Sequence, residues 1–331
     1  MSRKYCLGIE STAHTFGASV VTSEGIILSD EKSVYRPERG GGIHPRECSQ
    51  YHASHAAEVI SRAIEVSGIR FRHLSAIAFS QGPGLGPCLR NGATIARALS
   101  LSLSLPLIPV NHAMAHIEIG SLSTRTKDPL VLLVSGGHTC IAGFAGDYWR
   151  VIGETQDITL GNLLDMFGRE MGFPSPGGPE VERLAQRGAN YIDLPYVIKG
   201  NDVSYSGLFT ALLNRANQKS NRCEDICFSL QETAFSTITE ATERALAFTG
   251  KKELLLTGGV AANRRLQTML RHIAKKHNTK FAVVPQNLAA DGGAQIAWTG
   301  YLAFSHGVTL DIANSQVKPQ WRFDQIQVPW R

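Results

Sequence analysis

Two histidines, His112 and His116, are the sharpest chemical signal in the sequence. On a helix, side chains four residues apart lie on one face with Cβ atoms ~5–6 Å apart, so both imidazoles can bind one metal ion. A zinc peptidase with this spacing carries a glutamate directly after the first histidine as its general base, but the residue here is Ala113. A peptidase is therefore disfavoured. Two histidines on a partly exposed helix face explain the spacing equally well.

Asp291 is the candidate third ligand. It follows Pro285 and precedes two glycines and an apolar stretch that predicts a helix. A carboxylate at this place can reach a metal ion, or it can cap the helix by accepting hydrogen bonds from the first backbone N–H groups. The position alone favours the cap.

Turns built from small residues follow several predicted strands. Such turns let the backbone approach an anion closely and present N–H groups to phosphate oxygens. One turn would mean little, but five favour a nucleotide held between two lobes, and the sequence contains no P-loop or Rossmann glycine motif. The five turns lie at residues 11–12, 82–86, 135–137, 176–178 and 258–259.

Three polar residues near these turns are candidate nucleotide contacts. Asp165 and Glu182 flank the turn at 176–178. Their carboxylates can accept hydrogen bonds from the hydroxyls of a ribose, or they can be ordinary solvated acids. Asn263 follows the turn at 258–259 and can either bind an adenine or cap the next helix.

The elements that must position these residues occur in two similar series. The first contains apolar strands, a helix at 45–66 that ends at Gly68, and a later strand at 107–110 that leads into the histidine helix. From Leu130 an apolar strand, a small-residue turn and a His-Thr step recur. Duplicated units of this kind build a two-lobed α/β fold. We expect an N-terminal lobe at 1–125 and a C-terminal lobe at 126–331, with an insertion around 188–225.

Charge is distributed unevenly along the chain. The formal net charge is +5, but residues 251–331 carry 11 basic and 4 acidic groups. Many of the basic groups accompany a predicted helix whose apolar face includes Leu266, Leu270 and Ile273. Such a helix can attract RNA, and a solvated basic face is an equally good interpretation.

Composition excludes several classes of protein. With 43% hydrophobic and 18% charged residues the chain resembles folded globular proteins, and no run approaches the ~18 apolar residues of a membrane span. The first predicted strand starts almost at Met1, from which we expect no signal peptide, no membrane attachment and a cytoplasmic location. The scattered cysteines predict no disulfide framework, and Cys223 and Cys227 are better explained as buried spacers than as metal ligands.

These motifs together resemble the universal tRNA N6-threonylcarbamoyladenosine transferase family, in particular its archaeal and eukaryotic branch, which works in the KEOPS complex and was formerly named O-sialoglycoprotein endopeptidase. The resemblance runs through almost the whole chain. Its motifs lie at residues 8–14, 41–46, 81–87, 110–119, 134–139, 161–165, 176–178, 204–207, 258–263 and 291–294.

The resemblance implies a duplicated two-lobed α/β fold of the actin, hexokinase and chaperone-ATPase (ASKHA) type. It also implies that His112, His116 and Asp291 are catalytic and bind one divalent metal ion, iron or zinc first and magnesium as a third candidate. ATP, AMP or threonylcarbamoyl-adenylate would occupy the nucleotide cleft. The residues implied to contact it are Ser135, Gly136, Gly137, Asp165, Gly178, Glu182 and Asn263.

The implied reaction is an acyl transfer from threonylcarbamoyl-adenylate to N6 of the adenosine beside the anticodon, in tRNAs that read codons starting with adenine. The implied partners are tRNA and KEOPS-type subunits, including a small kinase-like ATPase and a small dimerising subunit. A nucleotide-binding scaffold or switch without chemistry of its own is the alternative. Two positions depart from the family pattern: Leu133 replaces the tyrosine of archaeal relatives, and Gly292 replaces an asparagine.

Overall fold

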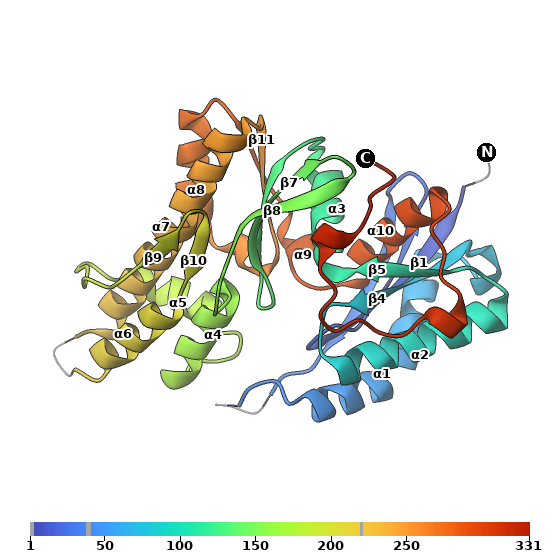
Figure 1. The fold of residues 1–331 in the computed structure, drawn as a ribbon. Helices are drawn as coiled ribbons and strands as arrows, with labels where there is room; N and C mark the ends of the chain where they lie inside the picture. Colours follow the sequence, from blue (N-terminus) through green and yellow to red (C-terminus); the bar gives the residue numbers. More distant parts are fainter. Residues whose placement is uncertain (1–2, 38–40, 219–220) are drawn as a thin grey trace. The chain divides into compact units, whose positions relative to one another are not determined.

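The computed structural model describes residues 3–37, 41–218 and 221–331 and divides the chain into two compact units (Figure 1). Unit 1 comprises Met1–Arg36, Ile43–Ser123 and Ala290–Arg331, and unit 2 comprises Pro37–Gly42 and Thr124–Ala289. The expected division placed residues 290–331 in the C-terminal lobe, whereas these residues cluster with unit 1. The reason is that helix α10 (Gly293–Ser305) packs against the sheet of unit 1.

Unit 1 is built on a five-stranded sheet with the order β3-β2-β1-β4-β5. The first three strands pair antiparallel, and β1, β4 and β5 are parallel. The strands are β1 (Tyr5–Glu10), β2 (Thr15–Thr22), β3 (Ile27–Val34), β4 (Ala76–Gly82) and β5 (Leu107–Asn111).

Helices cover both faces of this sheet. Helices α1 (Pro45–Ser67) and α2 (Gly86–Leu103) pack on the side that buries Leu7 and Ile9, and α10 packs on the opposite side (Figure 1). Successive residues of a strand point to opposite faces, so Gly8 faces α10. A Cβ at Gly8 would overlap the backbone nitrogen of Ala297, which explains why glycine is needed where the helix approaches. Helix α3 (His112–Thr124) follows β5 directly.

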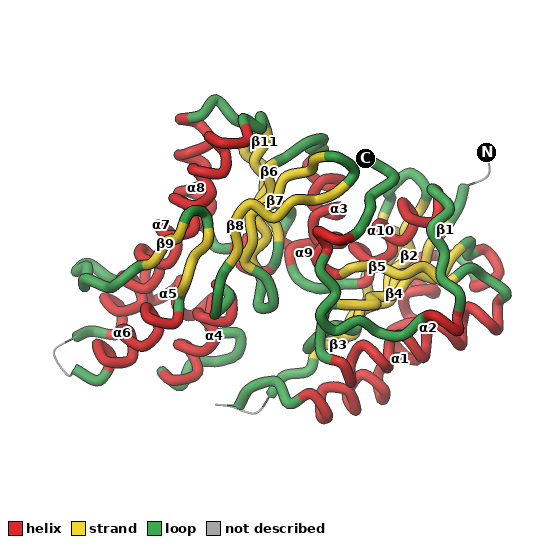
Figure 2. Tube along the Cα trace, in the orientation of Figure 1, coloured by secondary structure: helices red, strands yellow, loops and turns green. Residues whose placement is uncertain are grey.

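Unit 2 repeats the same sheet topology. Read from its β8 edge, the sheet has the order β8-β7-β6-β11-β12, so each strand corresponds to the strand at the same place in the order of unit 1. Figure 2 shows β6, β7, β8 and β11 together in this sheet. The duplication expected from the sequence is therefore confirmed. The strands are β6 (Leu130–Val134), β7 (Thr139–Ala145), β8 (Tyr148–Glu154), β11 (Glu253–Thr257) and β12 (Lys280–Val283).

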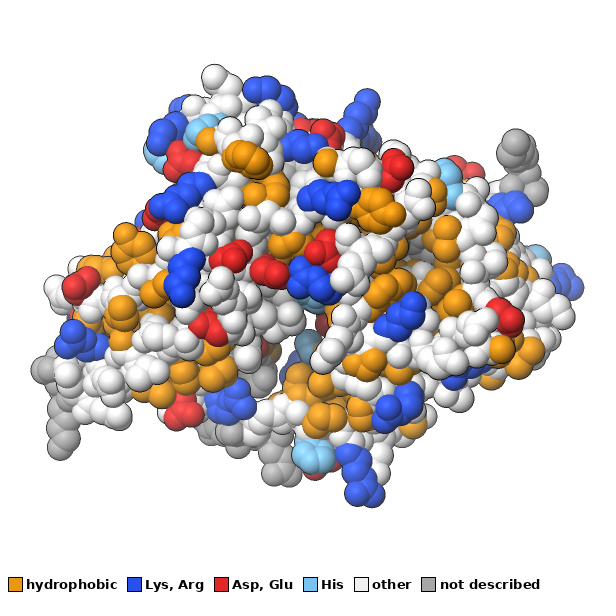
Figure 3. Space-filling view, in the orientation of Figure 1, with side chains coloured by type: hydrophobic (Ala, Val, Ile, Leu, Met, Phe, Trp, Pro, Cys, Tyr) orange, Lys and Arg blue, Asp and Glu red, His pale blue; other side chains and the backbone are white. Residues whose placement is uncertain are grey.

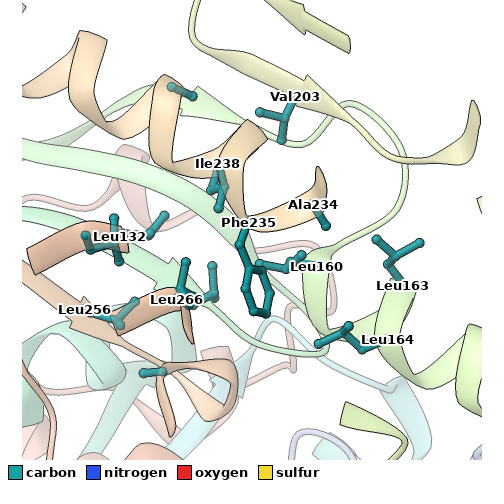
Figure 4. Close-up of a cluster of buried hydrophobic side chains, with 14 of the residues drawn as sticks. Leu132, Leu160, Leu163, Leu164, Val203, Ala234, Phe235, Ile238, Leu256 and Leu266 are labelled. Atoms are coloured by element: carbon teal, nitrogen blue, oxygen red, sulfur yellow. The ribbon is translucent and has the colours of Figure 1, made fainter. Parts of the chain in front are cut away.

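The core of unit 2 lies between its sheet and its helices. Phe235 of α7 is fully buried among Leu132 of the sheet, Leu160 of α4 and other apolar side chains (Figure 4). The helices are α4 (Leu160–Glu170), α5 (Gly178–Ala185), α6 (Ser206–Ala216), α7 (Cys223–Thr249), α8 (Arg264–Lys276) and α9 (Gln286–Ala289). Short 3-10 helices lie at Phe71–His73 (η1), Gly259–Ala262 (η2), Ile312–Asn314 (η3) and Phe323–Gln325 (η4).

The segment expected as an insertion contains a small hairpin and a helix. Strands β9 (Val197–Lys199) and β10 (Asp202–Ser204) pair with each other, and α6 packs against α7. Residues 219 and 220 of this segment lie outside the described part. Among the described residues, no helix combines the length and the apolar character needed to cross a bilayer.

The predicted basic helix is α8. Its buried face includes Leu266, Leu270 and Ile273, as the periodicity indicates. Acidic residues of α7 neutralise part of its charge, because Arg265 donates two hydrogen bonds of 2.6 Å to Glu232 and other pairs lie farther along. In Figure 3, basic and acidic side chains lie side by side over α8 at the upper left. These pairs favour the solvated face over an RNA-binding surface.

Candidate functional site

The two histidines lie at the start of α3. Asn111 fixes this start, since the backbone N–H groups of Ala113 and Met114 donate to Asn111 Oδ1 at 3.0 and 3.1 Å. Both histidine side chains are buried, and their ring centroids are 4.7 Å apart. The alternative interpretation, two histidines on a partly exposed helix face, is therefore wrong.

Asp291 lies against both imidazoles. Its Oδ1 atom is 3.2 Å from His116 Nε2 and 3.5 Å from His112 Nε2. The N-cap of α10 is Gly292, and the Ala294 N–H donates to Asp30 Oδ1 at 3.3 Å. The interpretation of Asp291 as a helix cap is therefore wrong, because Asp30 of β3 binds the helix end instead.

A further residue, Glu10, is fully buried and orients the first histidine. Glu10 is the last residue of β1, and its Oε2 atom accepts a 2.9 Å hydrogen bond from His112 Nδ1. The other oxygen, Oε1, accepts from the Thr12 N–H at 2.6 Å. A carboxylate at Nδ1 keeps the proton on that nitrogen and assigns Nε2 as the nitrogen that would ligate a metal, an arrangement typical of metal-binding histidines. Glu10 was not among the predicted site residues, although a charge at the end of an apolar strand is a usable signal.

Electrostatics couple these groups. Burial alone would lower the pKa of His112, but the carboxylates of Glu10 and Asp291 outweigh it and raise the pKa to about 9. Burial lowers the pKa of His116 despite its contact with Asp291. Burial would raise the pKa of Asp291, yet His112 and His116 hold it far below its ordinary range. The metal-free cluster therefore retains a proton on His112 that a metal ion must displace.

The donor set fits a divalent metal ion. The ligand atoms of His112, His116 and Asp291 all lie within 4.8 Å of one another. Two neutral imidazoles and one carboxylate suit zinc or ferrous iron better than magnesium, which prefers oxygen ligands alone.

The nucleotide candidates Ser135, Gly136 and Gly137 form one turn of unit 2 at the end of β6. Ser135 Oγ accepts from the N–H groups of Gly137 and His138 at 3.2 and 3.0 Å. Gly136 and Gly137 are exposed, and no heavy atom lies within 4 Å of where a Cβ would stand at either. The backbone here is open to a ligand.

Asp165 and Gly178 lie together beside the next turn. Asp165 Oδ1 accepts a 2.8 Å hydrogen bond from the Gly177 N–H, and Gly178 is the first residue of α5. Glu182 of α5 accepts from the Arg264 N–H at 2.8 Å, at the start of α8. Both carboxylates therefore hold backbone in place, which neither the ribose nor the solvated interpretation predicts.

Asn263 caps α8. Its Oδ1 accepts from the Arg265 and Leu266 N–H groups at 2.9 and 3.1 Å, and its amide donates to Gln231 at 3.0 Å. The N-cap interpretation is confirmed. Asn263 and Glu182 therefore meet at one helix end.

Gly258 (φ +93°) brings the turn after β11 against the backbone of Val134, next to the Ser135 turn.

A sequence model of the family described as tRNA N6-adenosine threonylcarbamoyltransferase matches residues 26–298. A Thermofilum pendens protein of that name is 50% identical over 325 residues, covering 98% of this chain and 96% of its own. A Caldivirga maquilingensis protein of the same name is 47% identical over 324 residues, covering 98% and 97%. The chain belongs to the tRNA N6-adenosine threonylcarbamoyltransferase family.

A longer relative carries a second description. The Methanocaldococcus jannaschii protein named "Probable bifunctional tRNA threonylcarbamoyladenosine biosynthesis protein" is 48% identical over 325 residues, which cover 98% of this chain and 60% of that protein. In that relative, the threonylcarbamoyltransferase-like part is joined to additional sequence.

Solved structures confirm the predicted fold. HypF from T. kodakarensis superposes with a TM-score of 0.64 at 15% identity, covering 92% of this chain and 48% of that one. The activator of 2-hydroxyisocaproyl-CoA dehydratase from Clostridium difficile superposes with a TM-score of 0.54 at 11% identity, covering 91% and 94%. The chain thus has the duplicated α/β fold of the actin, hexokinase and chaperone-ATPase type.

The two departures from the family pattern have different surroundings. Leu133 is fully buried in β6, where its apolar side chain cannot ligate a metal ion. Gly292 is extended (φ −168°), and a Cβ there would lie 3.1 Å from Asp30 Oδ1. A larger residue at 292 would therefore press against the carboxylate that holds the start of α10.

Proposed function

We propose that this chain transfers the threonylcarbamoyl group from threonylcarbamoyl-adenylate to N6 of the adenosine beside the anticodon, in tRNAs that read codons starting with adenine. The observation that carries the proposal is about 50% identity over 98% of the chain to threonylcarbamoyltransferases. The buried cluster of His112, His116 and Asp291 supports it independently, because it offers a catalytic centre.

In the reaction, the N6 amine attacks the carbamoyl carbon, the bond from that carbon to the phosphate oxygen breaks, and AMP leaves while the amine loses a proton. An adenine amine is a weak nucleophile, so orientation of the two substrates contributes as much as activation. The chain's part is to hold the adenylate, to orient the amine and to stabilise negative charge on the leaving phosphate.

We assign the metal ligands to His112 Nε2, His116 Nε2 and Asp291, with iron or zinc as the first candidates and magnesium as the third. When bound, a divalent cation supplies Lewis acidity that polarises phosphate or carbonyl oxygens. Glu10 serves as a positioning residue, because its hydrogen bond keeps the proton of His112 on Nδ1.

We assign nucleotide binding to unit 2. The open backbone at Gly136 and Gly137 would face phosphate oxygens, with Ser135 fixing the turn. The remaining candidates would shape the pocket for the nucleoside through the turn and helix starts that they hold. They are Asp165, Gly178, Glu182 and Asn263.

The proposed partners are tRNA and KEOPS-type subunits, among them a small kinase-like ATPase and a small dimerising subunit. The relatives support tRNA as a partner, because proteins named for a tRNA modification match 98% of this chain. A cytoplasmic location stays a prediction from the sequence.

The test supplies the chain with labelled threonine, bicarbonate, ATP, a threonylcarbamoyl-adenylate synthase and tRNA, with and without the partner subunits. We expect label in the tRNA at N6 of the adenosine beside the anticodon. A double variant, His112→Ala/His116→Ala, should lose the transfer, whereas the matched control of two exposed histidines, His272→Ala/His306→Ala, should retain it. Absence of label in every combination would contradict the proposal.

A further inference from the structure

A second group of metal-ligating side chains lies in unit 1, on helices α1 and α2. Cys48 and His52 are four residues apart on α1, so they share a helix face. Cys88 is the third residue of α2. All three side chains are fully buried, and their ligand atoms lie within 4.8 Å of one another. None of the three belongs to the cluster around Asp291.

The geometry matches what a tetrahedral cation requires. With a metal–sulfur bond of ~2.3 Å and a metal–nitrogen bond of ~2.0–2.1 Å, two donors on a tetrahedral ion stand roughly 3.6 Å apart. The distance from Cys48 Sγ to His52 Nε2 is 3.7 Å. Little movement would therefore be needed to place an ion between these atoms.

Neighbouring groups hold the donors in place. The His52 ring packs edge-on against Phe16, with centroids 5.7 Å apart. Cys48 Sγ donates a 3.1 Å hydrogen bond to the Ala13 carbonyl oxygen. The Sγ atoms of Cys48 and Cys88 lie within 4.8 Å of each other, and this proximity raises the pKa of Cys48 and lowers that of Cys88. Burial lowers the pKa of His52, which keeps the imidazole neutral.

We propose that Cys48, His52 and Cys88 form a structural binding site for one thiophilic divalent cation, with Zn²⁺ as the fitting ion. On binding, the two thiols release two protons, and two thiolates balance the two positive charges. The resulting site is neutral, which suits a location without contact to solvent, whereas a monovalent ion would leave a buried negative charge. Thiolate and imidazole ligands together favour zinc over magnesium or calcium.

The site would join the starts of α1 and α2 to the turn after β1. Ala13 belongs to this turn, and Glu10 immediately precedes it. The ion would thus stabilise unit 1 without taking part in the transfer reaction. The proposal is independent of the proposed function.

The test uses the full chain, reduced, stripped of metal and titrated with Co²⁺ without oxygen. A thiolate bound to Co²⁺ gives a charge-transfer absorption that the sulfur-free cluster of His112, His116 and Asp291 cannot produce. We expect this band to saturate when one Co²⁺ ion per chain is bound at the cysteine site. It should remain in the His112→Ala/His116→Ala variant and disappear on addition of Zn²⁺.

Cysteine variants locate the ion. Cys48→Ser and Cys88→Ser should each abolish the band and the rise in Tm that Zn²⁺ causes. The control variant, Cys223→Ser/Cys227→Ser, removes two thiols from α7 and should keep both the band and the rise in Tm. Circular dichroism checks that each variant folds, and if one serine variant is unfolded the other decides.

Three results would overturn the proposal. The first is the absence of a charge-transfer band in the wild-type chain when thiol titration shows Cys48 and Cys88 to be reduced. The second is a band that survives Cys48→Ser or is lost in the α7 control. The third is a Cys48–Cys88 disulfide in freshly prepared protein, found by mass spectrometry, because that bond would consume both thiolates.

Discussion

The ends of β1 and β6 occupy equivalent places in the two sheets, yet they carry different chemistry. β1 ends in Glu10, which is fully buried and bonded to His112, whereas β6 ends in Val134, followed by the exposed turn at Gly136 and Gly137. The duplicated topology thus provides two similar strand ends, and side chains alone decide their use. In unit 1 the polar groups are buried and paired before any ligand binds. In unit 2 the backbone is left open.

The largest expected effect tests how strongly unit 1 depends on buried charge. Arg331 donates to both carboxylate oxygens of Glu118 on α3 at 2.9 and 3.0 Å, and both side chains are largely buried. Removing one partner of such a pair leaves an uncompensated charge, so Arg331→Ala should lower the free energy of unfolding by about 3–5 kcal/mol. Urea denaturation measures this value.

The exposed pair Arg322–Asp324 provides the matched control. Arg322→Ala should cost less than about 1 kcal/mol, because exposed ion pairs contribute little. If Arg331→Ala and Arg322→Ala lowered the free energy of unfolding equally, burial of the Arg331–Glu118 pair would make no contribution to stability.

The next effect is a pH dependence of the metal-free protein. Burial lowers the pKa of His112, but the carboxylates of Glu10 and Asp291 outweigh this effect and raise the pKa from 6.5 to about 9. Its stabilisation should therefore be complete below pH 6.5 and disappear as the pH rises through 9, a loss of at most about 3 kcal/mol. Urea midpoints of chelator-treated protein between pH 6 and pH 10 measure it. A His112→Gln variant should lack this decline, and an unchanged decline would exclude His112 as its source.

Glu10→Gln tests the positioning role at intermediate size. The Gln amide cannot accept from both His112 Nδ1 and the Thr12 N–H, so one of these hydrogen bonds is lost. Loss of such an outer partner costs 10–100-fold in metal affinity as a rule. Calorimetric titration in a Cys48→Ser background, which removes the second proposed site, should show this loss. An unchanged affinity would mean that Glu10 does not orient the ligand.

The smallest expected change is in unit 2. Because a Cβ at Gly136 meets no atom within 4 Å, Gly136→Ala should alter the free energy of unfolding by less than about 0.5 kcal/mol. Nucleotide affinity should nevertheless fall, since the methyl group blocks the open backbone. Comparing urea denaturation with AMP binding separates the two effects. If Gly136→Ala instead lowered the stability and left AMP binding intact, the turn after β6 would serve the fold and not the ligand.

The sequence predicts much of the fold because local signals determine it. Gly68 ends α1 in the left-handed region (φ +70°), as expected for a helix C-cap. The repeated strand pattern reveals the duplication. The membership of residues 290–331 in unit 1 could not be predicted in this way, because the packing of α10 on β1 joins segments far apart in the chain and leaves no local signal.

The candidate site shows the same limit. The spacing of His112 and His116 is visible in one helix turn, but Asp291 joins them only through the fold, and its position favoured a cap that Asp30 provides instead. Cys48 and Cys88 likewise meet because α1 and α2 pack together. Contacts between distant segments therefore account for these parts of the site, whereas the charge of Glu10 at the end of an apolar strand was a local signal.

Asp291 completes the proposed metal centre, and we expect the transfer to depend on it. The most direct measurement compares two proteins that both carry Cys48→Ser, one with Asp291 and one with Asp291→Asn. The labelled-threonine assay gives the transfer rate of each, and the metal content of the same samples reports on the His112 site. We expect the variant to fold but to lose both the metal ion and more than about 100-fold of the transfer rate, because removing a ligand costs more than removing a residue that only orients one. Wild-type transfer by a metal-free Asp291→Asn protein would contradict this expectation.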